Sequence, residues 1–124
     1  MKKFLSSAML AVSMLVFTPN CEATDVWVDH WNYEDVDIFV MDDTIASDSN
    51  AHGRGFTVST KEVKNGTLQR VIHWHFFIGK GSWAYTASSM DPNVAPRVLP
   101  RDTIFEFCMN QLGWFYRTNN GYYD

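Results

Sequence analysis

Two histidines, His73 and His75, flank a tryptophan in the segment VIHWHFF, residues 71–77. In a strand, residues two apart point to the same face and lie about 7 Å apart, so both imidazoles could bind one zinc or copper ion. A tetrahedral zinc site needs at least a third protein ligand even when water is the fourth. His30, His52 or an acid could supply it, but nothing in the sequence places one nearby. The same spacing is typical of ordinary strand histidines, which is the interpretation we prefer.

Other kinds of chemistry have weaker support. The acid-rich residues 25–48 offer oxygen ligands for calcium, but they lack the glycine and the closing glutamate of an EF-hand loop. No serine lies in a nucleophile-elbow motif, and there is no glycine-rich phosphate loop. Cys108 is expected to be a buried, unreactive thiol, with a reactive or intermolecular thiol as the alternative. We therefore predict that the protein is not an enzyme and uses no cofactor, with a small hydrolase as a remote alternative.

The first 23 residues have the parts of a secretory signal peptide. A basic start, MKK, precedes the apolar run FLSSAMLAVSMLVF, which is too short for a transmembrane span. Small residues, Cys21 and Ala23, then mark a cleavage site near Ala23. We expect residues 1–23 to be removed and residues 24–124 to form one exported domain without a transmembrane span, in the periplasm, at the cell surface or secreted. Cleavage would remove Cys21; its lipidation, or a disulfide with Cys108, is the alternative.

The composition is that of a globular protein. The chain has 124 residues, a formal net charge of −4 and 15% aromatic residues, which indicates a folded core and not a disordered chain. Between Thr24 and Gly53 there are acids but no lysine or arginine. Nucleic acid is therefore excluded as a partner, because binding its phosphates needs clusters of basic residues.

Alternating apolar and polar residues predict an antiparallel sheet. The expected strands cover residues 25–31, 34–41, 56–63, 68–78 and 83–89, with a short sixth strand at 97–99. The polar residues 41–55 are expected to form a turn and loop. The predicted fold class is α+β: an antiparallel meander of five or six strands with one C-terminal helix packed on one face.

The helix is predicted from a change of period after Pro100, which is placed to open it, and Gly113 is placed to end it. One helical face carries the apolar residues Ile104, Phe105, Cys108, Met109 and Leu112. Trp114 and Phe115 are expected to close the core beside the helix. Tyr122 and Tyr123, at the end of the chain, are expected to be flexible.

The turn Asn65–Gly66 is typical of a two-residue hairpin. A regular ladder from this turn places Val58 opposite His73 and Phe56 opposite His75. A second turn, centred on Lys80 and Gly81, places His75 opposite Thr86. The other face then carries an aromatic slab: Trp74, Phe76, Ile78, Trp83 and Tyr85.

With this register both faces carry more apolar area than a solvent-facing side usually does. One helix covers one face, so the second face is left for a ligand, a partner protein or a second copy of the chain. We predict an interaction surface formed by Trp74, Phe76, Trp83 and Tyr85, and a non-enzymatic binding function for the protein. The alternative is a periplasmic transition-metal-binding protein that uses His73 and His75. The sequence does not say which sheet face the helix covers.

The order of these segments resembles the surface-adhesin protein E-like family of small exported bacterial proteins. The likeness covers nearly all of the mature chain and rests on VWV, DIFVMDDTI, VSTKEVKNG, VIHWHFFIGKGSWAY and IFEFCMNQLGW. The resemblance implies a sheet of about six strands with a C-terminal helix, and residence at the cell surface or in the periplasm. It also implies adhesion to extracellular or host-matrix proteins and formation of a homodimer. The family's disulfide between helix and sheet has no evident counterpart, because Cys108 has no partner in the mature chain.

Overall fold

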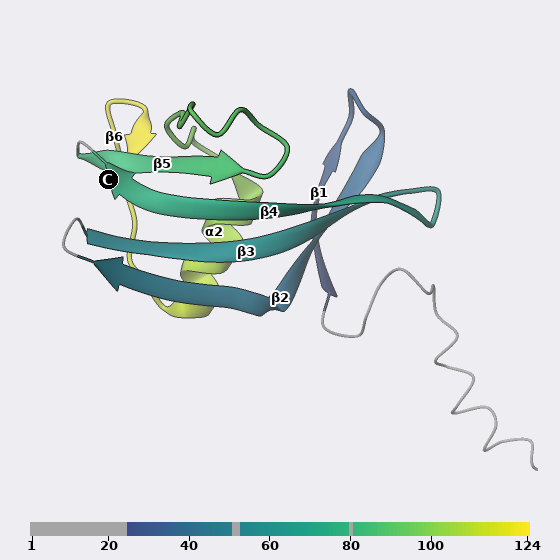
Figure 1. Cartoon of the computed structure of the whole chain (residues 1–124), viewed down its shortest axis with the longest axis horizontal. Helices are drawn as coiled ribbons and strands as arrows, with labels where there is room; N and C mark the ends of the chain where they lie inside the picture. Colours follow the sequence, from purple (N-terminus) through teal and green to yellow (C-terminus); the bar gives the residue numbers. More distant parts are fainter. Residues whose placement is uncertain (1–24, 51–52, 80) are drawn as a thin grey trace, which may run out of the picture.

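The computed structural model describes residues 25–50, 53–79 and 81–124. The predicted signal peptide and Cys21 lie outside these residues. Five strands form an antiparallel meander in the order β1–β2–β3–β4–β5: β1 Asp25–Trp31, β2 Val36–Asn50, β3 Gly53–Lys64, β4 Thr67–Gly79 and β5 Ser82–Ala87. The helix α2, Thr103–Leu112, packs behind this sheet (Figure 1). The predicted fold class is therefore confirmed.

A side chain caps the start of the helix, and a glycine caps its end. Its N-cap is Asp102, whose carboxylate accepts a hydrogen bond of 2.9 Å from the Phe105 N–H. The helix thus begins at Thr103, three residues after Pro100, and Asp102 rather than Pro100 precedes its first turn. It ends at Gly113, which has φ 73°, a conformation that glycine adopts without steric cost. Within the described part of the chain, no helix has the length and apolar character of a membrane span.

The prediction of a loop over residues 41–55 is wrong. β2 continues through this polar stretch, and its residues 46–50 pair with residues 53–57 of β3. The ladder is irregular between Met41 and Ala46, where the Thr44 hydroxyl donates to the Met41 carbonyl at 2.6 Å. Ala46 and Asp48 are exposed, so this half of the strand has no apolar alternation that would mark it in the sequence. β1 and the first half of β2 turn away from the rest of the sheet (Figure 1).

The predicted register of β3 against β4 is wrong by one residue. The turn itself is confirmed, because Asn65 and Gly66 have φ angles of 51° and 79°, and Lys64 pairs with Thr67. Val63 pairs with Leu68, but Glu62 pairs with Arg70. The residue between these two pairs, Gln69, is therefore an extra residue on β4, that is, a β-bulge.

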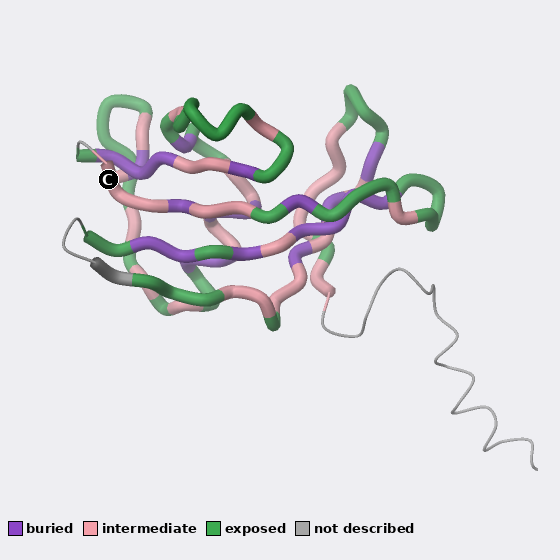
Figure 2. The backbone as a smooth tube through the Cα atoms, in the orientation of Figure 1, coloured by how far each residue is buried: buried purple, intermediate pink, exposed green. Residues whose placement is uncertain are grey.

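A one-residue shift moves every later side chain of the strand to the other face of the sheet. Trp74 consequently lies opposite Val58, and Phe76 lies opposite Phe56. His73 lies opposite Ser59 and His75 opposite Thr57. The large apolar side chains of this ladder thus share the covered face, whereas the histidine face is mixed, with Val71 and Phe77 beside the polar residues. Buried and more exposed positions alternate in the middle of β3 (Figure 2). The predicted register of β4 against β5 is confirmed, with His75 opposite Thr86.

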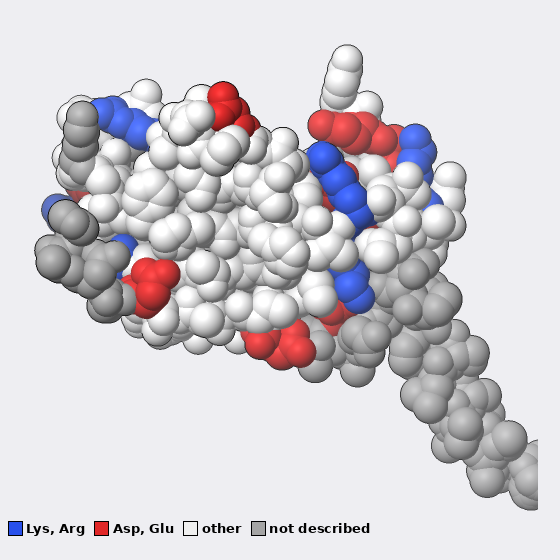
Figure 3. All heavy atoms as spheres, in the orientation of Figure 1, with Lys and Arg blue, Asp and Glu red and all other residues white. Residues whose placement is uncertain are grey.

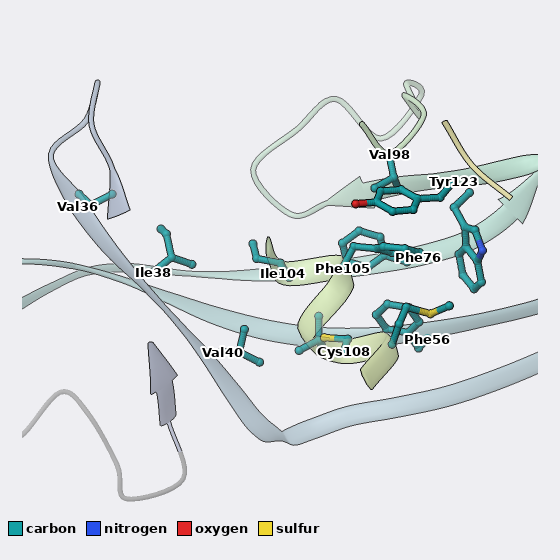
Figure 4. Close-up of a cluster of buried hydrophobic side chains, with 13 residues drawn as sticks. Val36, Ile38, Val40, Phe56, Phe76, Val98, Ile104, Phe105, Cys108 and Tyr123 are labelled. Atoms are coloured by element: carbon teal, nitrogen blue, oxygen red, sulfur yellow. The ribbon is translucent and has the colours of Figure 1, made fainter. Parts of the chain in front are cut away.

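The aromatic slab forms the core beneath α2. Phe105 is fully buried, and its ring lies 4.6–6.1 Å, between centroids, from five aromatic rings (Figure 4). These rings belong to Phe56, Phe76, Trp83, Tyr116 and Tyr123. Cys108 is also buried, which confirms the predicted burial of this thiol, and burial raises the pKa of the thiol to about 12.

The predicted interaction surface is corrected by this packing. Phe76 and Trp83 are only 0% and 1% exposed, because the bulge turns the slab towards the helix. Trp74 and Tyr85 lie on the same covered face and are half-buried against the core. These four side chains therefore do not form an open surface on the side of the sheet away from α2.

The C-terminal segment is ordered against the core, so the predicted flexibility of Tyr123 is wrong. Residues Thr118–Asn119 (β6) and Tyr122–Tyr123 (β7) form a small hairpin. Tyr123 is 1% exposed, and its hydroxyl accepts hydrogen bonds from the Arg101 and Asp102 N–H groups at 2.8 and 3.3 Å. Trp114 packs on the core as expected. Phe115, in contrast, is 81% exposed.

The expected sixth strand at 97–99 is present only as a short contact on the outer edge of β5. Arg97 forms a single antiparallel bridge with Ala84. The Val98 N–H donates to the Trp83 carbonyl at 2.9 Å, and the Tyr85 N–H donates to the Pro96 carbonyl at 3.0 Å. This segment covers the central part of the β5 edge, which would otherwise present unpaired backbone groups.

Candidate functional site

Among the described residues, no helix covers the face of the sheet turned away from α2, which is called the free face below. Its centre carries Thr57 and Ser59 from β3, His73 and His75 from β4, and Thr86 from β5. Figure 3 shows the molecular surface in the orientation of Figure 1, with the free face towards the viewer. The centre of this surface shows no lysine, arginine, aspartate or glutamate, and the charged groups lie towards its margins. The centre of the free face therefore combines hydroxyl groups and imidazoles with few formal charges, the carboxylate of Asp48 reaching His75 from β2.

An open depression of about 490 Å³ lies on the free face, bordered on one side by Pro92 of the loop after β5. Hydroxyl groups and imidazoles contribute to its lining, from Thr44, Thr57, Ser59, Thr86, Ser88, His73 and His75, and the apolar residues Val58, Trp74 and Ala87 complete it. Hydroxyls both donate and accept hydrogen bonds, and a neutral imidazole does the same through its two nitrogens. The depression therefore offers many hydrogen-bonding groups in a small area without a fixed charge of one sign.

His73 is held by hydrogen bonds on both sides. Its Nδ1 lies 2.7 Å from the Ser59 Oγ. Its backbone N–H donates to the Ser88 Oγ at 3.0 Å, and the Ser88 N–H donates to the His73 carbonyl at 2.9 Å. A serine within hydrogen-bonding distance of a histidine is one requirement of a nucleophile and its base. No carboxylate contacts the His73 ring within the part of the chain that the structure describes.

His75 contacts a carboxylate from two strands away. Its Nε2 lies 3.2 Å from the Asp48 Oδ2, and the two side chains meet over Gly55 of the intervening strand. A Cβ atom at Gly55 would lie 2.7 Å from the Asp48 Oδ1 and 3.4 Å from the His75 Nε2. Glycine at this position therefore makes room for the contact. The separation is that of an ion pair, but the two groups are not aligned as a hydrogen bond, and Nε2 has no other hydrogen-bond partner among the described residues.

The structure places His73 and His75 on one face, as a shared metal site would require. It does not bring a third ligand to them: across residues 25–50, 53–79 and 81–124, no group of three or more histidines, cysteines and acids is arranged to hold a metal ion. His30 is engaged elsewhere, and His52 lies outside the described residues. Since tetrahedral zinc needs at least three protein ligands, the metal-binding alternative stays a prediction without a complete ligand set.

His30 lies beside the turn between β1 and β2, where two carboxylates contact its ring. Its Nδ1 lies 2.9 Å from the Asp37 Oδ1, and its Nε2 lies 3.2 Å from the Asp35 Oδ1. A neutral imidazole carries only one N–H, so two carboxylates favour the charged imidazolium. The hydrogen bond with Asp37 raises the pKa of His30 above its usual 6.5. Hydrogen bonds from Trp27 and His30 lower the pKa of Asp37 below its usual 3.8.

These shifts predict two contributions to stability, from His30 and from Asp37, that are both complete only at mildly acidic pH. The His30 contribution is complete below about pH 6.5 and is lost as the pH rises through the raised pKa of the folded state. The Asp37 contribution is complete above about pH 3.8 and is lost as the pH falls through its lowered pKa. NMR titration of the His30 ring protons should therefore give a pKa above 6.5. In Asp37→Asn, the His30 pKa should fall; an unchanged value would contradict the assignment.

Comparisons of the chain with protein-family models, with curated proteins and with solved structures each return no match. The resemblance to the surface-adhesin protein E-like family accordingly stays a prediction. The candidate site is therefore defined by its own geometry. Sequence reasoning identified His73 and His75 and correctly placed Thr86 beside His75. It placed Ser59 and Thr57 on the opposite face and Asp48 and Gly55 in a loop.

Proposed function

We propose that the protein is a non-enzymatic binding module whose partner contacts the free face of the sheet. The observation that supports this most is the depression of about 490 Å³ on that face, with its hydroxyl and imidazole groups and few formal charges. Serine and threonine side chains lose little conformational freedom when a partner covers them. Fixed in a sheet, they form a pre-ordered surface, and a pre-ordered surface lowers the cost of binding.

The partner that we propose is a protein: an extracellular or host-matrix protein, or a second copy of this chain. Hydrogen-bonding side chains such as those of Thr57 and Thr86 suit the polar part of a protein–protein interface. The predicted signal peptide would export the chain to the periplasm or the cell surface, where such a partner is met. The resemblance to the protein E-like family supports the same class of partner.

Thr57 and Gln111 offer a matched test of this proposal, because both are exposed, Thr57 on the free face and Gln111 on α2. Thr57→Arg is expected to weaken binding by about tenfold or more, since a bulky charge at the centre of an interface must be desolvated. Gln111→Arg, with the same added charge, should change binding less than about twofold. Binding would be measured by surface plasmon resonance on immobilised matrix proteins, and self-association by sedimentation equilibrium. Equal effects of the two variants would place the contact surface elsewhere.

A small hydrolase is the second candidate, and the 2.7 Å separation of Ser59 Oγ and His73 Nδ1 favours it. The binding proposal predicts that Ser59 is not an activated nucleophile, because no described carboxylate orients His73 as the third member of such a site does. Incubation with a fluorophosphonate probe should therefore leave Ser59 unlabelled by intact-mass analysis. Stoichiometric labelling that disappears in Ser59→Ala would favour the hydrolase.

A further inference from the structure

A second cavity, of about 300 Å³, lies on the covered side of the sheet, at the N-terminal end of α2. Aromatic side chains from three strands, two carboxylates and the start of the helix line it. They are Trp31 of β1, Trp74 of β4, Tyr85 of β5, Asp29, Asp102 and Arg101, with Thr103 and Ile104 closing the helix side. Trp74 also borders the depression on the free face, but the two cavities have no other lining residue in common.

The aromatic walls of this cavity are fixed by the core. Trp31, Trp74 and Tyr85 are half-buried and pack against the buried cluster, and the Trp74 and Tyr85 ring centroids lie 5.8 Å apart. The faces of tryptophan and tyrosine rings carry partial negative charge and attract cations, most strongly when the site is partly desolvated. Aromatic walls favour organic cations over small inorganic ions, which hold their water more strongly.

The carboxylates are also held in place and keep spare acceptor capacity. Asp29 accepts hydrogen bonds from the Thr103 hydroxyl at 3.0 Å and from the His30 N–H at 2.8 Å. Asp102 accepts from the Phe105 N–H as the helix cap. An ionised carboxylate has about four acceptor positions, so each can accept more. Burial, and then the charges of Glu106 and Asp29, raise the pKa of Asp102, so a cation placed nearby would relieve repulsion.

Positive charge is present as well, at the rim and at the helix end. Arg101 is exposed and forms no ion pair with another described residue. The N-terminus of α2 adds a partial positive charge, which the Asp102 cap partly offsets. Among the described residues that line the cavity, the negative charges of the two carboxylates, Asp29 and Asp102, are thus opposed only by the Arg101 guanidinium at the rim and by the partial charge of the helix end.

We propose that this cavity binds an organic ammonium group, seated between Trp31, Trp74 and Tyr85 with Asp29 and Asp102 as its counter-charges. The ligand class is that of alkylammonium and quaternary ammonium compounds. The proposal does not depend on the function assigned to the free face, because its test changes no residue of that face.

Choline and its uncharged isostere 3,3-dimethylbutan-1-ol provide the direct test, by calorimetric titration of the whole chain at constant ionic strength. Choline is expected to bind one to one, about tenfold or more tighter than the isostere. Saturable binding should be accompanied by a change in tryptophan fluorescence. Absence of saturable choline binding, or equal affinity for both compounds, would overturn the proposal.

Variants separate the site from general charge attraction. Asp29→Asn, which keeps an oxygen for the Thr103 hydroxyl, should weaken choline binding about tenfold. Asp43→Asn makes the same charge change at an exposed position of β2 and should leave choline binding unchanged. Equal weakening in both would contradict a local site. If Asp29→Asn does not fold, Arg101→Gln carries the test: choline should bind several-fold tighter when the rim charge is removed, and weaker binding would refute the assignment.

Discussion

Replacing Phe105 by alanine is expected to lower the free energy of unfolding by about 4 kcal/mol. The ring is fully buried and lies among five other aromatic rings at the contact between α2 and the sheet. Its removal forfeits the apolar burial and leaves a cavity that these large rings cannot fill without leaving their rotamers. For a domain of this size, whose total stability is about 5–15 kcal/mol, such a loss populates the unfolded state measurably. Urea denaturation followed by tryptophan fluorescence would measure it.

The chain contains its own control for this substitution. Phe115 lies just beyond the helix and is 81% exposed. Phe115→Ala removes the same atoms from a position where they are already in water, so stability should change by less than about 0.5 kcal/mol. Similar losses in the two variants would mean that α2 does not pack on the sheet as described.

Replacing Tyr123 by phenylalanine is expected to cost about 3 kcal/mol, because one hydroxyl serves three partners. It accepts from the Arg101 and Asp102 N–H groups and donates to the Glu106 carboxylate. Phenylalanine retains the ring but leaves these groups without their partner in a half-buried place. The neighbouring substitution Tyr122→Phe is the control: the Tyr122 ring stacks under the Arg97 guanidinium at 4.7 Å, a contact that survives loss of the hydroxyl. It should cost less than about 0.5 kcal/mol.

The same hydroxyl predicts how stability changes in alkali. Burial, and then the hydrogen bond to Glu106, raise the pKa of Tyr123 from 10.0 to about 12. A raised pKa means that folding favours the protonated phenol, so its contribution is complete below about pH 10 and is lost as the pH rises towards 12. Unfolding free energies measured across this range should fall more steeply for the natural chain than for Tyr123→Phe. Parallel curves would show that the Tyr123 hydroxyl is not buried in this network.

The bulge at Gln69 has the largest consequence for function. Without the bulge, the histidines would share a face with Phe56 and Val58, and the aromatic slab would lie on the opposite face from Phe56 and Val58. With it, His73 and His75 lie beside Ser59 and Thr57 on the free face. The centre of the candidate binding face therefore carries hydroxyl and imidazole groups. The aromatic residues that first suggested an interaction surface are buried in the core or packed against it. A binding role for the sheet now rests on hydroxyl and imidazole groups, and the half-buried Trp74 and Tyr85 belong instead to the cavity beside α2.

The sequence by itself determined the elements that depend on local signals. Alternation marked the strands, the change of period marked the apolar face of α2, and Gly113 ended the helix as expected. The Asn65–Gly66 turn followed from residues that tolerate positive φ. A second pair of this kind, Asn120–Gly121, has φ angles of 57° and 83° and forms the turn between β6 and β7. It was a usable signal for the ordered tail, and sequence reasoning missed it.

Tertiary structure alone decided which side of β4 faces the helix. The ladder pairs by backbone groups, which are the same in either register, so the turn could not exclude an extra residue at Gln69. Packing decides between the two registers. With the bulge, Phe56 and Val58 are buried together with Trp74 and Phe76 under Phe105, which we expect to remove more apolar area from water than the regular register would. The contact of Asp48 with His75 over Gly55, and the cavity shared by three strands and the start of α2, likewise join residues that only the folded sheet brings together.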